Sequence, residues 1–131
     1  MMKHILIMED NVELALEWRD TFELNGHKVT LTHNGEEAVK QLDETKFDLV
    51  ISDLFVPGKK GGLHVVGKIL RMRRGAPPII AVTGQKRIRD TEEDTNYFLR
   101  QVEQLGVSQT LEKPFPAAEL LLIADKFWSR G

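Results

Sequence analysis

Short runs of apolar residues alternate along the chain with longer stretches in which apolar residues recur at helical spacing. The short runs predict strands at residues 4–8, 27–32, 47–52, 79–83 and 107–111, the last of them weak. The stretches between and after them predict helices at residues 11–24, from 34 through 42, from 63 to about 72, around 98–105 and from 116 through 128. Residues 84–95 are polar and charged, which predicts a long loop. Strands separated by helices indicate an α/β fold, with an open parallel sheet covered on both faces, because parallel strands need crossover connections.

The composition fits one folded domain. The chain has 131 residues, 41% of them hydrophobic and 29% charged, so we expect a single domain over residues 1–131 with no output domain. The net charge of −2 argues against direct binding to nucleic acid, and the absence of cysteine excludes disulfides and thiolate metal sites. The apolar run after Lys3 is too short for a signal peptide, and no run is long enough to cross a membrane. A cytoplasmic protein without membrane contact is therefore expected.

Chemically capable side chains stand at the ends of four predicted strands. Glu9 and Asp10 follow the first strand, Asp53 follows the third, Thr83 ends the fourth, and Lys113 follows the fifth. The carboxyl ends of parallel strands meet at one edge of the sheet, where sites in such folds lie. Carboxylates gathered there would repel one another unless a cation neutralised them, and carboxylate and carbonyl oxygens suit Mg²⁺. The sequence therefore predicts a magnesium site at this edge.

We expect the metal ion to be bound directly by the carboxylates of Asp10 and Asp53 and through water by that of Glu9. The main-chain carbonyl of Phe55 is a further expected ligand. Beside a metal ion, Asp53 can act as a nucleophile that accepts a phosphoryl group as an acyl phosphate. Lys113 would present an ammonium to the phosphoryl oxygens, and Thr83 would donate from its hydroxyl.

In these features the chain resembles the response-regulator receiver domains of two-component signalling, from Ile5 to about Trp128. The matching pieces are Glu9-Asp10, Asp53-Leu54-Phe55-Val56-Pro57 followed by Gly61, Thr83-Gly84 and Lys113-Pro114-Phe115. The resemblance implies a flavodoxin-like (βα)5 three-layer sandwich with strand order 2-1-3-4-5 and a cis Lys113-Pro114 bond. It also implies Mg²⁺-dependent phosphorylation of Asp53 by a sensor histidine kinase or phosphotransfer protein. Phosphorylation would then switch the binding of a downstream protein that the sequence does not identify.

Three features depart from the family pattern. Thr110 stands where the family usually has an aromatic switch residue, which puts the usual coupling of phosphorylation to the outer face in doubt. The separation between Thr83 and Lys113 is longer than is common, and residues 85–96 account for the excess. Phe55 replaces the polar residue often found two positions after the acceptor. We expect Phe55 to limit the access of water and so to prolong the life of the phosphoryl group.

An alternative function is a receiver-like docking module that acts without phosphorylation, and Thr110 is its best support. A phosphatase is disfavoured because Phe55 offers no group for proton transfer. We therefore expect no enzyme activity beyond the domain's own phosphotransfer and dephosphorylation. Trp18 and Trp128 are expected at the margins of the core.

Overall fold

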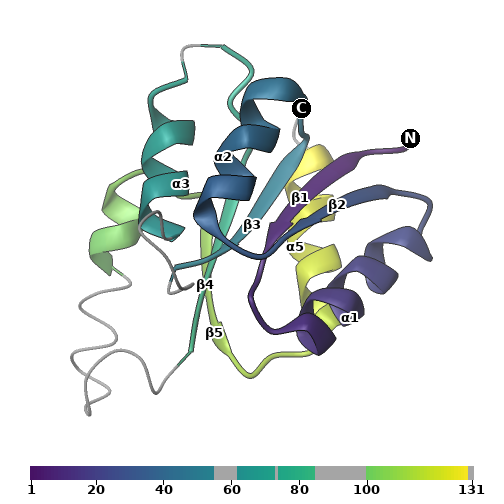
Figure 1. The fold of residues 1–131 in the computed structure, drawn as a ribbon. Helices are drawn as coiled ribbons and strands as arrows, with labels where there is room; N and C mark the ends of the chain where they lie inside the picture. The colour runs from purple at the N-terminus through teal and green to yellow at the C-terminus, as the bar shows by residue number, and fades with distance from the viewer. Residues whose placement is uncertain (55–61, 73, 85–99, 130–131) are drawn as a thin grey trace.

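A computed structural model describes residues 1–54, 62–72, 74–84 and 100–129 (Figure 1). Its parallel sheet has the strand order β2-β1-β3-β4-β5, as predicted. The strands are β1 (His4–Met8), β2 (Lys28–Thr32), β3 (Leu49–Asp53), β4 (Ile79–Gly84) and β5 (Gln109–Lys113). The helices are α1 (Val12–Glu23), α2 (Gly35–Glu44), α3 (Gly62–Leu70) and α5 (Ala117–Ser129), and residues 100–104 are also helical. Figure 1 shows α1 and α5 on one face of the sheet and α2 and α3 on the other, which confirms the three-layer sandwich.

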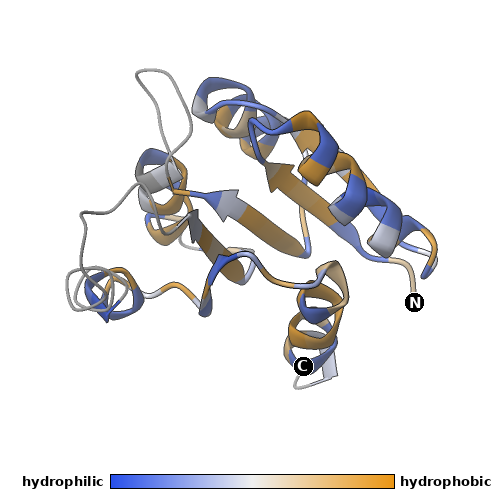
Figure 2. Ribbon diagram, turned by 90° about the horizontal axis from the view of Figure 1, so that it is seen from below, coloured by the Kyte–Doolittle hydropathy of each residue, from blue (hydrophilic) through white to orange (hydrophobic). Residues whose placement is uncertain are grey.

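The sheet divides the hydrophobic core into two parts. Alternate residues of β1 point to opposite faces: Ile5 and Ile7 pack on the α1 and α5 side, and Leu6 and Met8 pack on the α2 and α3 side. All four side chains are fully buried, as expected for a parallel sheet that helices cover on both faces. Figure 2 shows the hydrophobic strands enclosed between the helical layers.

The register of the strands aligns their carboxyl ends. Met8 of β1 pairs with Ser52 of β3, and Asp53 pairs with Val82 of β4. At the next pair of strands, Gly84 of β4 lies opposite Lys113 of β5. The residues that follow β1 therefore share one edge of the sheet with the last residues of β3, β4 and β5.

The predicted bounds of four strands differ from the observed ones by one or two residues, and the third and fifth strands differ at both ends. The third strand begins at Leu49, because Phe47 packs into the core before the strand starts. The fifth strand runs from Gln109 to Lys113 instead of over 107–111. Val107 is buried in the core on the α2 and α3 side, so its apolar character reflects the connection into β5. As a result, Lys113 is the last residue of the strand.

Trp18 also departs from expectation. It is 1% exposed and belongs to the core on the α1 and α5 side, whereas Trp128 is partly buried at the edge of that core. The loop predicted at 84–95 lies outside the described residues except for Gly84, which ends β4. None of the helices in the described parts of the chain has the length and apolar character needed to cross a bilayer.

Candidate functional site

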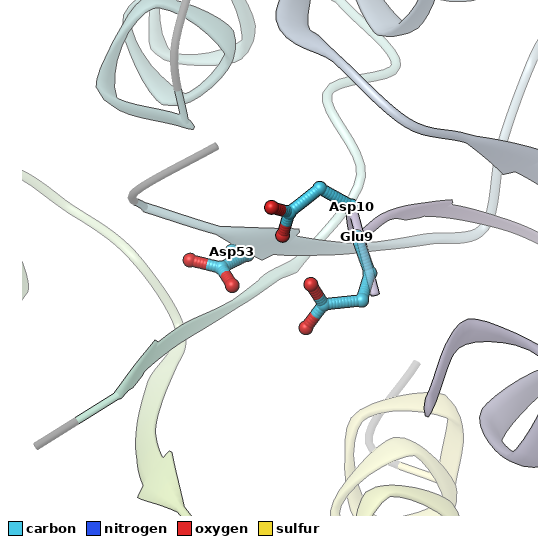
Figure 3. A group of neighbouring side chains, drawn as sticks. All are labelled: Glu9, Asp10 and Asp53. Carbon is cyan, nitrogen blue, oxygen red and sulfur yellow. The ribbon is translucent and has the colours of Figure 1, made fainter. Parts of the chain in front are cut away.

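Three carboxylates meet at the carboxyl edge of the sheet (Figure 3). Glu9 and Asp10 follow β1 directly, and Asp53 is the last residue of β3. One oxygen atom from each carboxylate lies within 4.8 Å of the other two. Glu9 is 0% exposed and Asp53 1% exposed, while Asp10 is half-buried. The structure thus brings together the acidic residues that the sequence predicts.

Backbone contacts fix the turn that carries Glu9 and Asp10. The Glu9 backbone N–H donates to the Thr32 carbonyl oxygen at 3.0 Å. His33 Nδ1 lies 3.0 Å from the Glu9 carbonyl oxygen, and because a carbonyl only accepts, this ring nitrogen carries the proton. Asn11 then caps α1, with its side-chain oxygen accepting from the Leu14 backbone N–H at 3.1 Å. The acidic pair is therefore held between a strand end and a helix start.

Lys113 supplies a positive charge to two of the carboxylates. Its Nζ donates to Asp53 Oδ2 at 2.8 Å and also to Glu9 Oε1. The Lys113 side chain is 22% exposed. Burial by itself would lower the pKa of Lys113, but the hydrogen bonds and charges of Asp53 and Glu9 outweigh it and raise the pKa. Lys113 therefore stays an ammonium in contact with the Asp53 carboxylate.

The site strongly affects the protonation of Glu9. Its burial, together with a hydrogen bond to Asp10, raises its pKa from 4.5 to about 7, although Lys113 and the Asn11 backbone N–H pull in the opposite direction. The neighbouring charge of Asp53 contributes to this rise. Among the described residues, the Lys113 ammonium thus leaves part of the cost of burying the Glu9 charge uncompensated.

Thr83 is at the same edge, one residue beyond the position of β4 that pairs with Asp53. It is 0% exposed, and its hydroxyl has no hydrogen-bond partner among the residues that the structure describes. An unpaired buried hydroxyl costs about 1–3 kcal/mol. Thr83 therefore holds a donor that a ligand at this edge can use.

The start of α3 lies against the backbone of the residue that carries the central carboxylate. A Cβ on Gly62 would overlap the Asp53 carbonyl oxygen and the Leu54 Cα, and would lie 2.8 Å from the Asp53 carbonyl carbon. The Leu54 backbone N–H donates to the Val82 carbonyl oxygen at 2.9 Å and so continues the sheet past Asp53. Sequence reasoning did not single out Gly62, because one sequence carries no signal for this close approach.

The structure therefore brings Glu9, Asp10, Asp53 and Lys113 into one cluster and places Thr83 at the same edge. The predicted Lys113-Pro114 cis bond is present. The Phe55 main-chain carbonyl, the fourth expected ligand, lies outside the described residues, as do Pro57 and Gly61.

Comparison with known proteins places the chain in a protein family. A family model described as the response regulator receiver domain matches residues 5–125. The chain belongs to that family. It is 32% identical over 118 residues to the uncharacterized transcriptional regulatory protein YkoG of Bacillus subtilis, a match that covers 90% of this chain and 47% of YkoG. It is 30% identical over 129 residues to the response regulator SaeR of Staphylococcus aureus, covering 98% of this chain and 52% of SaeR.

The chain thus spans about half the length of these curated relatives. Among solved structures, the receiver domain of Francisella response regulator 1452 matches with a TM-score of 0.80 and 24% identity, over 98% of each chain. NtrX from Brucella abortus matches with a TM-score of 0.80 and 21% identity, over 96% of this chain and 27% of NtrX. At these identities the two structures support the fold alone.

Proposed function

We propose that Asp53 accepts a phosphoryl group from a phosphohistidine of a sensor histidine kinase or phosphotransfer protein, and that phosphorylation changes the binding of a downstream protein. The observation that carries this proposal is the environment of Asp53. Its carboxylate is buried at a strand end, hydrogen-bonded to the Lys113 ammonium at 2.8 Å and next to two further carboxylates. Such a constellation suits a reaction that depends on positioning and charge neutralisation.

In the proposed reaction an Asp53 carboxylate oxygen bonds to phosphorus as the bond between phosphorus and the donor's imidazole nitrogen breaks. The nitrogen leaves with the electron pair, so no proton has to be removed from Asp53. The Lys113 ammonium, which is already at the carboxylate, donates to the oxygens of the arriving phosphoryl group. The Thr83 hydroxyl, which lacks a partner among the described residues, donates to another of these oxygens.

The carboxylates of Glu9, Asp10 and Asp53 fit a divalent cation in number, chemistry and spacing. We propose Mg²⁺, held directly by Asp10 and Asp53, through water by Glu9, and by the Phe55 carbonyl, which stays a prediction. When bound, the ion would neutralise charge on the transferring phosphoryl oxygens. The raised pKa of Glu9 agrees with a site where, among the described residues, a further positive charge would be favourable.

The test is an intact-mass measurement on protein incubated with Mg²⁺ and a small-molecule phosphodonor. The wild type is expected to gain one phosphoryl group and Asp53→Asn none. Asp48→Asn is the matched control, because Asp48 directly precedes β3 and lies at its opposite end, where its side chain accepts from the His4 backbone N–H. It should be labelled like the wild type. Labelling of Asp53→Asn, or loss of labelling in Asp48→Asn, would contradict the assignment of Asp53.

A constitutive docking module remains the second candidate, because one observation favours it. Thr110, at the position of the usual aromatic switch, donates from its hydroxyl to Glu103 Oε1 at 2.7 Å and so ties β5 to the helical residues 100–104 without an aromatic ring. If no donor and no divalent ion gives labelling, this candidate is preferred. The expectation of a domain that works without an output domain stays a prediction.

A further inference from the structure

The Lys113 ammonium has a third neighbour besides its two carboxylates. Its Nζ lies over the indole ring of Trp18, 5.8 Å from the ring centroid, within the range of about 6 Å for a cation–π contact. Trp18 comes from α1 and is 1% exposed, so the contact is shielded from water on the side of the ring. We propose that Trp18 is a positioning residue, which holds the Lys113 ammonium at Asp53 for phosphoryl transfer. The inference rests on the proposed phosphorylation of Asp53.

A lysine needs such support if it is to act at one place. Its ammonium sits on a flexible four-carbon stem, and the strongly hydrated charge is drawn toward water. The Lys113 side chain is 22% exposed, so conformations that point into solvent are open to it. The face of an aromatic ring carries partial negative charge and attracts the ammonium, and the attraction grows when water is excluded. The indole therefore favours the conformation in which Lys113 reaches Asp53.

Trp18 is itself well fixed. Its ring stacks on Phe115 with a centroid distance of 5.6 Å and an interplanar angle of 21°. Trp18 thus contacts the residues on both sides of Pro114, namely Lys113 and Phe115. A smaller apolar side chain would still fill part of the core but would offer no ring face to the ammonium.

The chain contains its own control for simple packing. Trp128 is the other tryptophan, and the Lys3 ammonium lies over its ring at 5.9 Å, almost the same distance as in the Trp18 pair. Trp128 is near the amino ends of the strands, where its indole N–H donates to the Asp48 carbonyl oxygen at 3.2 Å. Loss of an indole and a lysine contact can therefore be compared at the site and away from it.

The first experiment measures the rate of phosphorylation by a small-molecule phosphodonor in excess Mg²⁺ for Trp18→Leu, Trp18→Phe and Trp128→Leu. Trp18→Leu is expected to lower the rate constant about tenfold and Trp18→Phe about threefold, because the benzene ring keeps part of the cation–π attraction. Trp128→Leu should stay within about twofold of the wild type. Equal rates for Trp18→Leu and Trp18→Phe, or an equal loss in Trp128→Leu, would overturn the proposal.

A second measurement uses tryptophan fluorescence and needs no phosphorylation. The variant Trp128→Phe contains one tryptophan, Trp18, so its tryptophan fluorescence reports on Trp18 alone. Adding Lys113→Met to this background is expected to shift the fluorescence emission of Trp18, because a charge over its ring is removed. Mg²⁺ is expected to shift this emission only in protein that retains Lys113. In Trp18→Phe, which reports on Trp128, Lys113→Met should have no effect. Unchanged Trp18 emission in Lys113→Met refutes the contact. If the wild type takes no phosphate, the proposed function fails, and the fluorescence comparison still decides whether Trp18 senses Lys113.

Discussion

The buried hydroxyl of Thr83 gives the sharpest test of how the site trades stability for function. Thr83→Val replaces this hydroxyl by a methyl group at a position that is 0% exposed. Because the hydroxyl has no hydrogen-bond partner among the described residues, the substitution removes a desolvation cost of about 1–3 kcal/mol and breaks no bond within that part of the chain. We expect the free energy of unfolding to rise by about 1–2 kcal/mol, which raises Tm by roughly 3–5 °C per kcal/mol for a domain of this size.

Thr32→Val is the matched control. Thr32 is also a buried strand residue, 2% exposed, but its hydroxyl donates to the Ile7 carbonyl oxygen at 2.9 Å. Losing this bond should lower the free energy of unfolding by about 1 kcal/mol. The same chemical change is thus expected to have opposite signs at the two positions, and urea unfolding without Mg²⁺ measures both.

Thr83→Val should raise the stability of the protein but lower its rate of phosphorylation. If its hydroxyl donates to the phosphoryl oxygens, Thr83→Val lowers the rate of phosphorylation by about tenfold, in line with the loss of one donor to a developing charge. Thr32→Val should keep the wild-type rate. The reasoning fails if Thr83→Val destabilises the protein as much as Thr32→Val does, or if it is phosphorylated as fast as the wild type.

Further predictions concern backbone packing and pH. Gly62→Ala should lower the free energy of unfolding by about 1–3 kcal/mol and weaken Mg²⁺ binding, because the new Cβ overlaps the Asp53 backbone. Gly67→Ala in the same helix is the control and should leave the stability unchanged or raise it. Calorimetry measures both variants, and equal effects would contradict the contact. The pKa of Glu9 is about 7 in the folded protein against 4.5 in the unfolded chain, so the free energy of unfolding without metal should fall as the pH rises from 4.5 to 7. Because Mg²⁺ binding releases the Glu9 proton, Mg²⁺ should bind more tightly at about pH 8 than at about pH 6. A Glu9→Gln variant that keeps this pH dependence would refute the assignment. Burial lowers the pKa of His27 below 6.5, so the stability that neutral His27 contributes is lost as the pH falls below that value. In urea unfolding, the stability of His27→Gln should therefore depend less on pH in the acid range than that of the wild type. An unchanged pH dependence would refute this assignment.

Much of the fold could be predicted because its signals are local. The alternation of short apolar runs with amphipathic stretches gave the parallel sheet and both helical layers, since strands buried on two faces read as continuous apolar runs. The positions of Glu9, Asp10 and Asp53 at one edge followed from the rule that carboxyl ends of parallel strands meet there. Where a strand is less apolar, the signal weakened. The fifth strand is polar along much of its length, so Val107, a core residue of the connection, displaced its predicted start.

The contacts that refine the site could not be read from the sequence. Trp18 lies far along the chain from Lys113, and helical periodicity shows only that its face is apolar, not which strand end covers it. Gly62 looks like any turn glycine until the path of the backbone past Asp53 is known. That the Thr83 hydroxyl finds no partner among the described residues is likewise a property of the folded state. Each depends on residues brought together by topology, for which one sequence offers no periodicity or spacing.

Two features of the site contribute unfavourable free energy in the absence of a ligand. Glu9 keeps a raised pKa even though it is hydrogen-bonded to Lys113, and the Thr83 hydroxyl has no partner within the described parts of the chain, so the resting site carries costs that the described residues do not offset. Ligands that satisfy these groups bind the native state alone and therefore stabilise it by mass action. Lys113 would have to share its donors between Asp53, Glu9 and a phosphoryl group, and its position at the end of β5 places it in the same strand as Thr110, whose hydroxyl reaches Glu103. If Asp53 is phosphorylated as proposed, β5 links the acceptor to residues 100–104; if the docking module is correct, the same Thr110–Glu103 contact holds that surface in place without phosphate.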